Sequence, residues 1–352
     1  MFNIHFFQRF HNLKKEILQG IFLGEEYRNN IFKEIEKYYS ETPVVFNIET
    51  TNACNMKCSF CPRTTLMTRK IENLDIDIYK KIINQLRSWN NDEWKTWKLF
   101  VENEYQIKEN EMNENHFYMY IIPRVLVLHG YGDPLLDKYI IERVEYISEN
   151  NLESYFSCNP SNINLEKIDN ICNAGLNYIK FSIDSTTLQI RGKKDKFHDY
   201  YPDIISVVEN IDKIGSMTKV IITMIDLNRE NQKEEWEQLK EYFKNTNVYI
   251  YLKSQDQTWY EQKEKNAASG KSICWSELCH FPWYAMTVKS NGDITMCSED
   301  YNNSIILGDT KKETLYNIWN GNKYKEFRKQ HMNNNCIYCK KNCDMKIFGN
   351  FL

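Results

Sequence analysis

Short apolar runs alternate with amphipathic stretches between residues 43 and 252, and this alternation organises most of the chain. Runs rich in Val, Ile and Phe predict buried β-strands. These runs are Val44–Glu49, Arg124–His129, Glu153–Ser157, Tyr178–Asp184, Lys219–Met224 and Val248–Leu252. Stretches with helical periodicity separate them, as at Ile76–Trp89, Lys138–Asn150 and Glu230–Phe243. Such a repeat predicts an α/β fold with a parallel sheet covered by helices.

The segments before and within this repeat have other patterns. Apolar residues recur at helical spacing from Phe6 to Ile21, so residues 2–40 are expected to form a helix that caps the main domain. A membrane-surface helix is the alternative, although the polar face also carries acids. Residues 90–123 separate the first helix from the second strand and are too long for an ordinary connection. This acidic insertion is interpreted either as a lid that contacts substrate or as a peripheral decoration.

The pattern changes after residue 255. Met286–Ser290 and Asp293–Cys297 flank Asn291-Gly292, a pair typical of a two-residue β-hairpin turn, and a helix is expected from about residue 314 to 331. We therefore expect an N-terminal helical extension, a main α/β domain that carries the insertion, and a small α+β module. Their expected bounds are 1–42, 43–255 and 256–352.

Charge and cysteine content narrow the function classes. The chain has 45 Lys and Arg against 48 Asp and Glu, a net charge of −3, so no nucleic-acid partner is expected. No apolar run approaches the roughly 18 residues of a transmembrane segment, and the N-terminus lacks the features of a secretory signal. A cytoplasmic location is predicted. In a reducing compartment, 11 cysteines are more typical of metal ligands or catalytic thiols than of disulfides.

Three cysteines follow the first predicted strand at the spacing C-x3-C-x2-C, namely Cys54, Cys58 and Cys61. Three thiolates on one loop can hold one soft metal centre. A structural zinc site is closed by four ligands, and the next histidine along the chain is His116. A centre held by three ligands keeps an open position, which favours a catalytic role.

A glycine-rich segment, Gly130-Tyr131-Gly132-Asp133-Pro134, follows the second predicted strand. Together with the cysteine triplet, it resembles the radical S-adenosylmethionine (SAM) superfamily, whose GxGEP segment has Glu where this chain has Asp. The resemblance implies a partial (β/α)6 TIM-like barrel and a [4Fe–4S] cluster held by the three cysteines and SAM. Reductive cleavage of SAM would give methionine and a 5′-deoxyadenosyl radical that abstracts a substrate hydrogen.

The resemblance also implies other SAM-binding positions near the C-terminal strand ends, where α/β domains place ligands. Carboxyl and carbonyl groups of the glycine-rich segment would accept hydrogen bonds from the SAM ammonium group. Ser182 resembles a polar position that contacts SAM, and Arg191 resembles an arginine that faces the SAM carboxylate. Phe60 and Met224 would pack near the adenine, although an ordinary core position fits Met224 equally. Asn159 lies where many members have Thr-Asn-Gly.

A second group of cysteines lies in the predicted C-terminal module. Four thiolates there make a closed site for zinc or for an iron–sulfur cluster, and the spacing alone does not choose between the two. These are Cys279, Cys297, Cys336 and Cys339. Their sequence context (C-x2-P-W, G-x4-C and C-x2-C) resembles the SPASM and shorter twitch modules of radical SAM enzymes, which implies one auxiliary [4Fe–4S] cluster. Cys274 or Cys343 is an alternative ligand.

The resemblance implies the oxidation of a small polyol, sugar or aminocyclitol alcohol to a ketone, with flavodoxin or ferredoxin as the electron donor. A base would help the substrate radical lose its proton. Asp184, Glu299 and Asp300 are candidates, and each also fits a surface or hydrogen-bonded carboxylate. The first alternative is a peptide maturase (oxidation, thioether formation or epimerisation), for which residues 1–42 are too few to form a leader-binding domain. The second is a non-enzymatic metal-binding scaffold.

Overall fold

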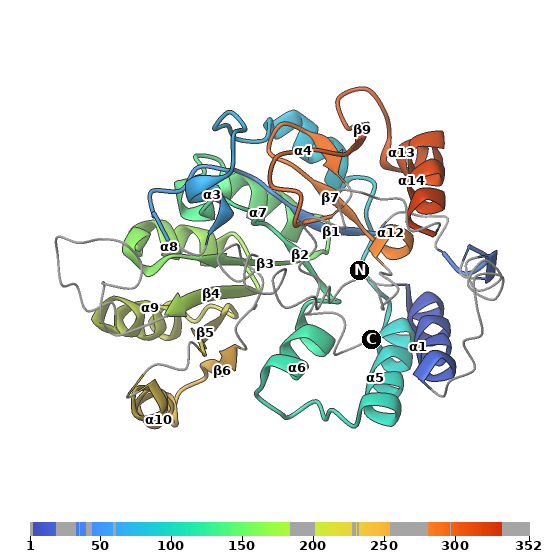
Figure 1. Ribbon diagram of the computed structural model, residues 1–352. Helices are drawn as coiled ribbons and strands as arrows, with labels where there is room; N and C mark the ends of the chain where they lie inside the picture. Colours follow the sequence, from blue (N-terminus) through green and yellow to red (C-terminus); the bar gives the residue numbers. More distant parts are fainter. Residues whose placement is uncertain are drawn as a thin grey trace.

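A nine-stranded sheet runs through the computed structural model, in the order β6-β5-β4-β3-β2-β1-β7-β8-β9 (Figure 1). The structure describes residues 3–18, 33–34, 36–39, 44–58, 61–183, 201–226, 230, 232–253, 281–295 and 297–332. Strands β1 to β6 are parallel and adjacent in chain order, as the strand–helix repeat predicts. Their bounds are β1 Val45–Ile48, β2 Val125–Val127, β3 Glu153–Cys158, β4 Tyr178–Ile183, β5 Lys219–Ile225 and β6 Tyr249–Lys253.

Helices that connect these strands cover one face of the sheet and bury its larger core. They are α4 Ile76–Ile83, α7 Ile140–Glu149, α8 Leu165–Asn173, α9 Tyr201–Lys213 and α10 Gln232–Phe243. The short helix α3 (Pro62–Thr65) follows the loop after β1, and 3-10 turns lie at Pro134–Leu136 and Pro160–Asn162. Alternate strand residues such as Phe156, Ile179 and Ile222 face this core. The α/β partial barrel is therefore confirmed.

The predicted helix Ile76–Trp89 is too long, because α4 ends at Ile83. A new helix, α5 (Asn91–Tyr105), begins a few residues later at a capping box. The Asn90 side chain accepts from the Glu93 amide, and the Glu93 carboxylate accepts from the Asn90 amide. This reciprocal cap satisfies amides that a continuous helix would bond internally, so it fixes a helix start.

The insertion packs with the N-terminal helix against the other face of the sheet. It contains α5, α6 (Glu114–His116) and a π-helical turn at Phe117–Ile121, and α5 lies beside α1 (Ile4–Leu18) in Figure 1. Side chains from α1, α5 and the π-helical turn share a second core with Tyr155 of β3 and Tyr251 of β6. The buried side chains of the insertion thus share a core with the inner face of the sheet, which differs from a purely peripheral decoration.

The C-terminal strands extend the same sheet. Strand β7 (Met286–Val288) pairs parallel with β1, and β8 (Asp293–Thr295) and β9 (Ile306–Asp309) follow antiparallel, which confirms the predicted hairpin. Gly292 has φ 83° in the hairpin turn, a left-handed conformation that glycine adopts without strain. The predicted single helix is two, α13 (Leu315–Asn320) and α14 (Asn322–Met332), separated at Gly321; the short α12 is Phe281–Tyr284. Among the described helices, none is long and apolar enough to cross a membrane.

Candidate functional site

The three cysteines of the first cluster lie on the loop that leaves the C-terminal end of β1. Cys54, Cys58 and Cys61 are half-buried and form no disulfide. The Cys61 amide and the Thr64 hydroxyl both donate to the Cys58 carbonyl, at 3.2 and 3.0 Å, and these bonds fold the loop into a turn before α3. Burial raises the pKa of Cys61, and the neighbouring Cys54 thiol adds to the shift.

This donor set fits a [4Fe–4S] cluster better than a single metal ion. Within the described ranges, no three Cys, His, Asp or Glu side chains are close enough to bind one ion. In a four-iron cluster each thiolate binds a different iron, so the ligands lie further apart than around one ion. Three accessible thiols on one loop meet that requirement and leave the fourth iron to another ligand.

The glycine-rich segment packs directly on the cysteine loop. The Asp133 amide donates to the Ala53 carbonyl at 2.7 Å, immediately before Cys54. A Cβ atom at Gly132 would lie 2.2 Å from the Thr51 carbonyl oxygen, and one at Gly130 would lie 2.8 Å from the Glu49 side chain. Only glycine allows this approach, so both glycines are required by the packing of the two segments.

Asp133 connects the glycine-rich segment to the loop after β3. Its carboxylate is almost fully buried and accepts from the Leu135 amide at 3.0 Å, the Asn159 amide at 3.2 Å and the Asn162 side chain at 2.6 Å. Burial raises the pKa of Asp133, although these donors oppose the shift. The structure therefore brings Asp133 and Asn159, two of the predicted SAM-binding positions, into contact.

Ser182 and Met224 lie on opposite faces of the sheet. The Ser182 hydroxyl is 3.5 Å from that of Ser157 and 3.4 Å from that of Thr223, so three neighbouring strands carry a row of hydroxyls on one face. Met224 follows Thr223 and is fully buried in the core beneath the outer helices. Met224 therefore occupies an ordinary core position, which was the alternative to an adenine contact.

A buried ion pair at the end of β1 was not anticipated. Arg69 donates to both oxygens of Glu49, at 2.7 and 2.8 Å, and the Glu49 side chain has no exposed surface. Burial alone would raise the pKa of Glu49. The Arg69 hydrogen bonds, the charge of the buried Lys289 and the Ser290 amide outweigh burial and hold the pKa below its usual value. In the sequence, the single Glu at the end of an apolar strand could have suggested this ion pair. No sequence feature indicates that Arg69 is its partner.

Cys297 lies just beyond β8, on the loop that leads to β9. The two predicted bases that follow it differ in environment. Asp300 is fully buried, and its oxygens accept from the Ser304 and Ile305 amides at 2.8 and 3.0 Å, which fixes the loop. Glu299 is half-buried, and the Ser298 hydroxyl lies 3.3 Å from its carboxylate. The charge of Glu299 contributes, after burial, to the raised pKa of Tyr131 in the glycine-rich segment.

The remaining predicted site residues fall outside the described ranges. They are Phe60, Asp184, Arg191, Cys274, Cys279, Cys336, Cys339 and Cys343. Of the predicted auxiliary ligands, Cys297 alone lies within these ranges.

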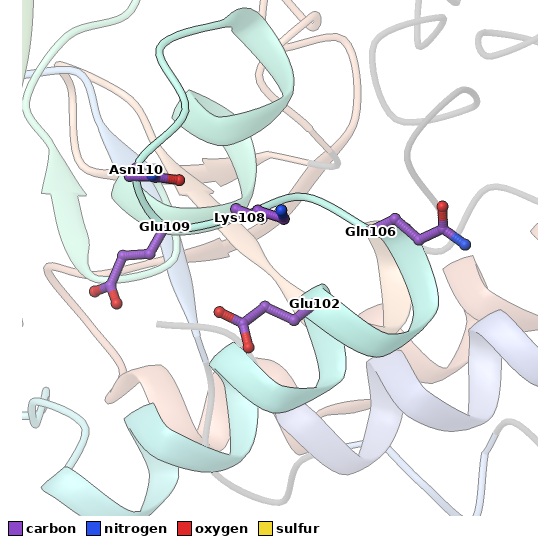
Figure 2. Close-up of a pocket in the computed structure, with 5 residues that line it drawn as sticks. All are labelled: Glu102, Gln106, Lys108, Glu109 and Asn110. Carbon is purple, nitrogen blue, oxygen red and sulfur yellow. The ribbon is translucent and has the colours of Figure 1, made fainter.

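A surface hollow of about 560 Å³ lies on the insertion. Figure 2 shows the Glu102 and Glu109 carboxylates directed into the same space, from α5 and from the loop that follows it. Gln106, Lys108 and Asn110 complete its lining. None of these five lining residues is a predicted site residue.

Comparisons with known proteins agree with this arrangement. Residues 48–243 match the radical SAM superfamily, and residues 279–344 match SPASM, an iron–sulfur cluster-binding domain. Among curated protein sequences, none matches this chain.

Solved structures that resemble the chain are distant in sequence. One is BtrN in complex with AdoMet and 2-DOIA (16% identity, 81% of this chain and 85% of that chain, TM-score 0.45). Another is Streptococcus suis SuiB bound to S-adenosylmethionine (13% identity, 90% and 78%, TM-score 0.48). A third is anSMEcpe with bound AdoMet (14% identity, 85% and 84%, TM-score 0.49). The radical SAM match spans more than half of the 352 residues, so the chain belongs to the radical SAM superfamily and is a radical SAM enzyme with a C-terminal SPASM domain.

Proposed function

We propose that Cys54, Cys58 and Cys61 hold the SAM cluster and that the segment 130–134 binds SAM beside it. The observation that carries this proposal is the contact between the two segments, in which the Asp133 amide bonds the Ala53 carbonyl and Gly132 lies on the Thr51 backbone. When bound, the cluster supplies the electron that splits SAM into methionine and a 5′-deoxyadenosyl radical.

The residues around SAM have distinct roles in this proposal. Backbone carbonyls of the segment 130–134 accept from the SAM ammonium group, because Asp133 already accepts three hydrogen bonds and fixes the Asn159 loop. Ser182 contacts SAM from β4. Phe60 and Arg191 take the adenine-side and carboxylate-side positions that the superfamily pattern gives them. Met224 supports β5 from the core side.

Cys279, Cys297, Cys336 and Cys339 are proposed to hold one auxiliary [4Fe–4S] cluster. The position of Cys297 supports this assignment, because the loop that follows it is hydrogen-bonded to the segment after Cys61. The Asn302 side chain accepts from the Thr68 amide at 2.8 Å and donates to the Leu66 carbonyl at 2.9 Å. When bound, this cluster supplies an acceptor for one electron.

The proposed reaction is oxidation of a small polyol, sugar or aminocyclitol alcohol to a ketone. In this oxidation the carbinol hydrogen atom would leave to the 5′-deoxyadenosyl radical and the hydroxyl proton to a base, and a cluster held by the four C-terminal cysteines would supply the acceptor for the remaining electron. Glu299 is the preferred base among the described candidates, because both oxygens of Asp300 are occupied by loop amides. The interior supports a small substrate, since α1 and the insertion fill one part of it and hydroxyls line another.

The test is anaerobic reconstitution with SAM, a flavodoxin or ferredoxin reductant and a panel of polyols, sugars, aminocyclitols and short peptides. Mass spectrometry should detect 5′-deoxyadenosine and, with one alcohol, a product two hydrogens lighter. Cys54→Ala should abolish both, whereas Cys158→Ala, which alters a buried core thiol, should leave both. Turnover of a peptide and of no alcohol would reject the alcohol proposal.

Iron content tests the number of clusters separately. The reconstituted protein should hold about eight iron atoms per chain, the content of two [4Fe–4S] clusters. Cys297→Ala should reduce this to about four and should retain 5′-deoxyadenosine formation without ketone formation. An unchanged iron content in Cys297→Ala would remove Cys297 from the ligand set.

A further inference from the structure

The buried Glu49–Arg69 pair contacts the glycine-rich segment, the hairpin and the loop after Cys297. Glu49 lies at the end of β1 and accepts from the Tyr131 amide of the glycine-rich segment at 3.1 Å and from the Ser290 amide of the hairpin at 3.1 Å. Arg69 lies after the cysteine loop and donates to the Tyr301 carbonyl, beyond Cys297, at 2.6 Å. One ion pair thus joins four separate segments.

Other contacts make the same connection around this pair. The Tyr131 ring lies edge-on to the Tyr301 ring with centroids 6.2 Å apart, and the buried Lys289 ammonium lies 5.5 Å from the Tyr131 centroid. Asn302 bonds the backbone at Thr68 and Leu66, directly before Arg69. The loop after Cys297 therefore reaches the glycine-rich segment both through Arg69 and through the rings of Tyr131 and Tyr301.

A second buried ion pair shows that burial alone does not produce this pattern. Asp137 and Arg143 are also fully buried, with Arg143 Nε 2.8 Å from the Asp137 carboxylate. Their other side-chain hydrogen bonds go to the Tyr139 amide and the Leu74 carbonyl, just before α7 and α4. The Asp137–Arg143 pair stabilises the packing of helices, whereas the Glu49–Arg69 pair connects the two cysteine loops to the glycine-rich segment.

We propose that Glu49 and Arg69 are positioning residues through which the loop after Cys297 sets the affinity of the glycine-rich segment for SAM. The proposal rests on the assignment of SAM to the segment 130–134. Glu49 holds the Tyr131 amide only while Arg69 is held by the Tyr301 carbonyl. A change in the loop 298–303 therefore moves the backbone that binds SAM, although that loop makes no proposed contact with SAM.

The first test changes the loop at a distance from the SAM site. Asn302→Ala removes the side-chain hydrogen bonds to Thr68 and Leu66, in the segment before Arg69. It should speed hydrogen–deuterium exchange of peptides covering residues 130–134 in the cluster-free protein, and weaken SAM binding by the reconstituted protein about 10-fold or more, as supporting residues around metal sites do. Thr310→Val is the matched control, because the Thr310 hydroxyl donates to the Gly292 carbonyl at 2.7 Å within the same module. Its exchange and SAM affinity should match the unmodified protein.

The second test replaces the pair while keeping its volume. Glu49→Gln with Arg69→Met removes both charges, a change that buried pairs often tolerate in folding. This variant should fold, yet bind SAM about 10- to 100-fold more weakly and show a smaller change in the reduced-cluster paramagnetic resonance spectrum on SAM addition. Thr310→Val, the control of the first test, should leave both properties unchanged.

The outcomes separate this inference from the proposed function. Unchanged exchange at residues 130–134 and unchanged SAM affinity in Asn302→Ala would overturn the inference and leave the SAM site assigned. Failure of the unmodified reconstituted protein to bind SAM would overturn the site assignment. In that case faster exchange in Asn302→Ala would still show the mechanical connection, because the exchange measurement needs no cofactor.

Discussion

Gly132 shows how strictly a single residue is constrained where two backbones meet. A Cβ atom there would lie 2.2 Å from the Thr51 carbonyl oxygen and 2.7 Å from its carbon, and neither backbone atom can rotate away. Gly132→Ala should therefore separate the glycine-rich segment from the cysteine loop. We expect it to lower the free energy of unfolding by about 1–3 kcal/mol, the usual cost of overpacking, and to abolish SAM cleavage.

Gly215→Ala is the control for that substitution. No atom lies within 4 Å of a Cβ at Gly215, so alanine there encounters only the left-handed backbone at φ +66°. A cost of about 1–2 kcal/mol is expected from the backbone alone, with normal SAM binding. Denaturant unfolding and SAM titration of both variants make the comparison. Normal SAM binding by Gly132→Ala would show that the contact with Thr51 is dispensable.

The shifted pKa of His129 should make the free energy of unfolding depend on pH. Burial, with the charges of Lys180 and Lys253, lowers the pKa of His129 to about 3, and its Nδ1 accepts from the Ser157 amide at 3.1 Å. The unfolded chain titrates near 6.5, so it binds the extra proton first as the pH falls. Stability due to the neutral imidazole is fully present above pH 6.5 and is lost progressively toward pH 3. The slope from one proton is about 1.4 kcal/mol per pH unit.

His129→Asn tests this assignment, because an amide oxygen can still accept from the Ser157 amide but does not titrate. Urea unfolding of the cluster-free protein at pH 7 and pH 5 should show a smaller loss of stability for the variant than for the unmodified chain. Equal losses in both proteins would show that His129 is protonated in the folded state.

The residues of the site differ in whether they can be recognised from local sequence spacing or only from contacts with distant residues. Cys54, Cys58, Cys61 and the glycines are readable because their spacing along the chain is itself the signal. Glu49 and Arg69 are not readable in this way. Glu49 is 20 positions from Arg69 and 241 positions from Ser290, and these partners come together only when β1, β2 and β7 pack. Asp300 looked like a catalytic base from its place after Cys297. Its hydrogen bonds to the Ser304 and Ile305 amides match the hydrogen-bonded carboxylate that was the alternative for this position, although the sequence does not identify these partners.

At the scale of elements, the insertion depends on one buried tryptophan. Trp97 of α5 has no exposed surface, donates from Nε1 to the Met119 carbonyl at 2.6 Å and packs edge-on against Phe7 of α1. It therefore joins α5, the π-helical turn and α1. Trp97→Ala should lower the free energy of unfolding by about 3–5 kcal/mol, measured by denaturant unfolding.

Trp236→Ala on α10 is the control, since that side chain is only partly buried at the edge of the outer core. A smaller loss is expected there. Equal losses of unfolding free energy in the two variants would show that Trp97 in the insertion stabilises the protein no more than Trp236 in a peripheral helix. The comparison also tests whether residues 90–123 stabilise the barrel as a whole or only themselves.

The elements differ in how accurately the sequence predicts their bounds. The strands of the parallel sheet were predicted within two residues of their bounds, because fully buried strands read as continuous apolar runs. Helix ends were less predictable, since the capping box at Asn90 and the interruption at Gly321 override the periodicity. The packing of α1 with α5 depends on aromatic side chains about 90 positions apart and has no local signal.

At the scale of the whole molecule, the C-terminal strands and the barrel share one sheet. Strand β7 supplies the outer partner of β1, through the bonds from the Met286 amide to the Val44 carbonyl at 2.7 Å and from the Glu49 amide to the Val288 carbonyl at 2.9 Å. The Ser290 amide and the Tyr301 carbonyl also satisfy the buried Glu49–Arg69 pair. Removal of β7 would expose the apolar edge of β1 and leave this ion pair short of partners.

We therefore expect a chain that ends at Lys253 to fail as an independent domain. An unpaired apolar edge strand favours aggregation, and a buried charge pair that loses its partners is strongly destabilising. A chain that ends at Met332 keeps β7, β8 and β9, and it should remain folded in the cluster-free state. Sedimentation and near-ultraviolet circular dichroism of the two truncated proteins make the comparison. A monomeric, cooperatively unfolding chain of residues 1–253 would show that β1 needs no partner from the C-terminal region, and that the shared sheet contributes geometry to the site without contributing to the stability of the barrel.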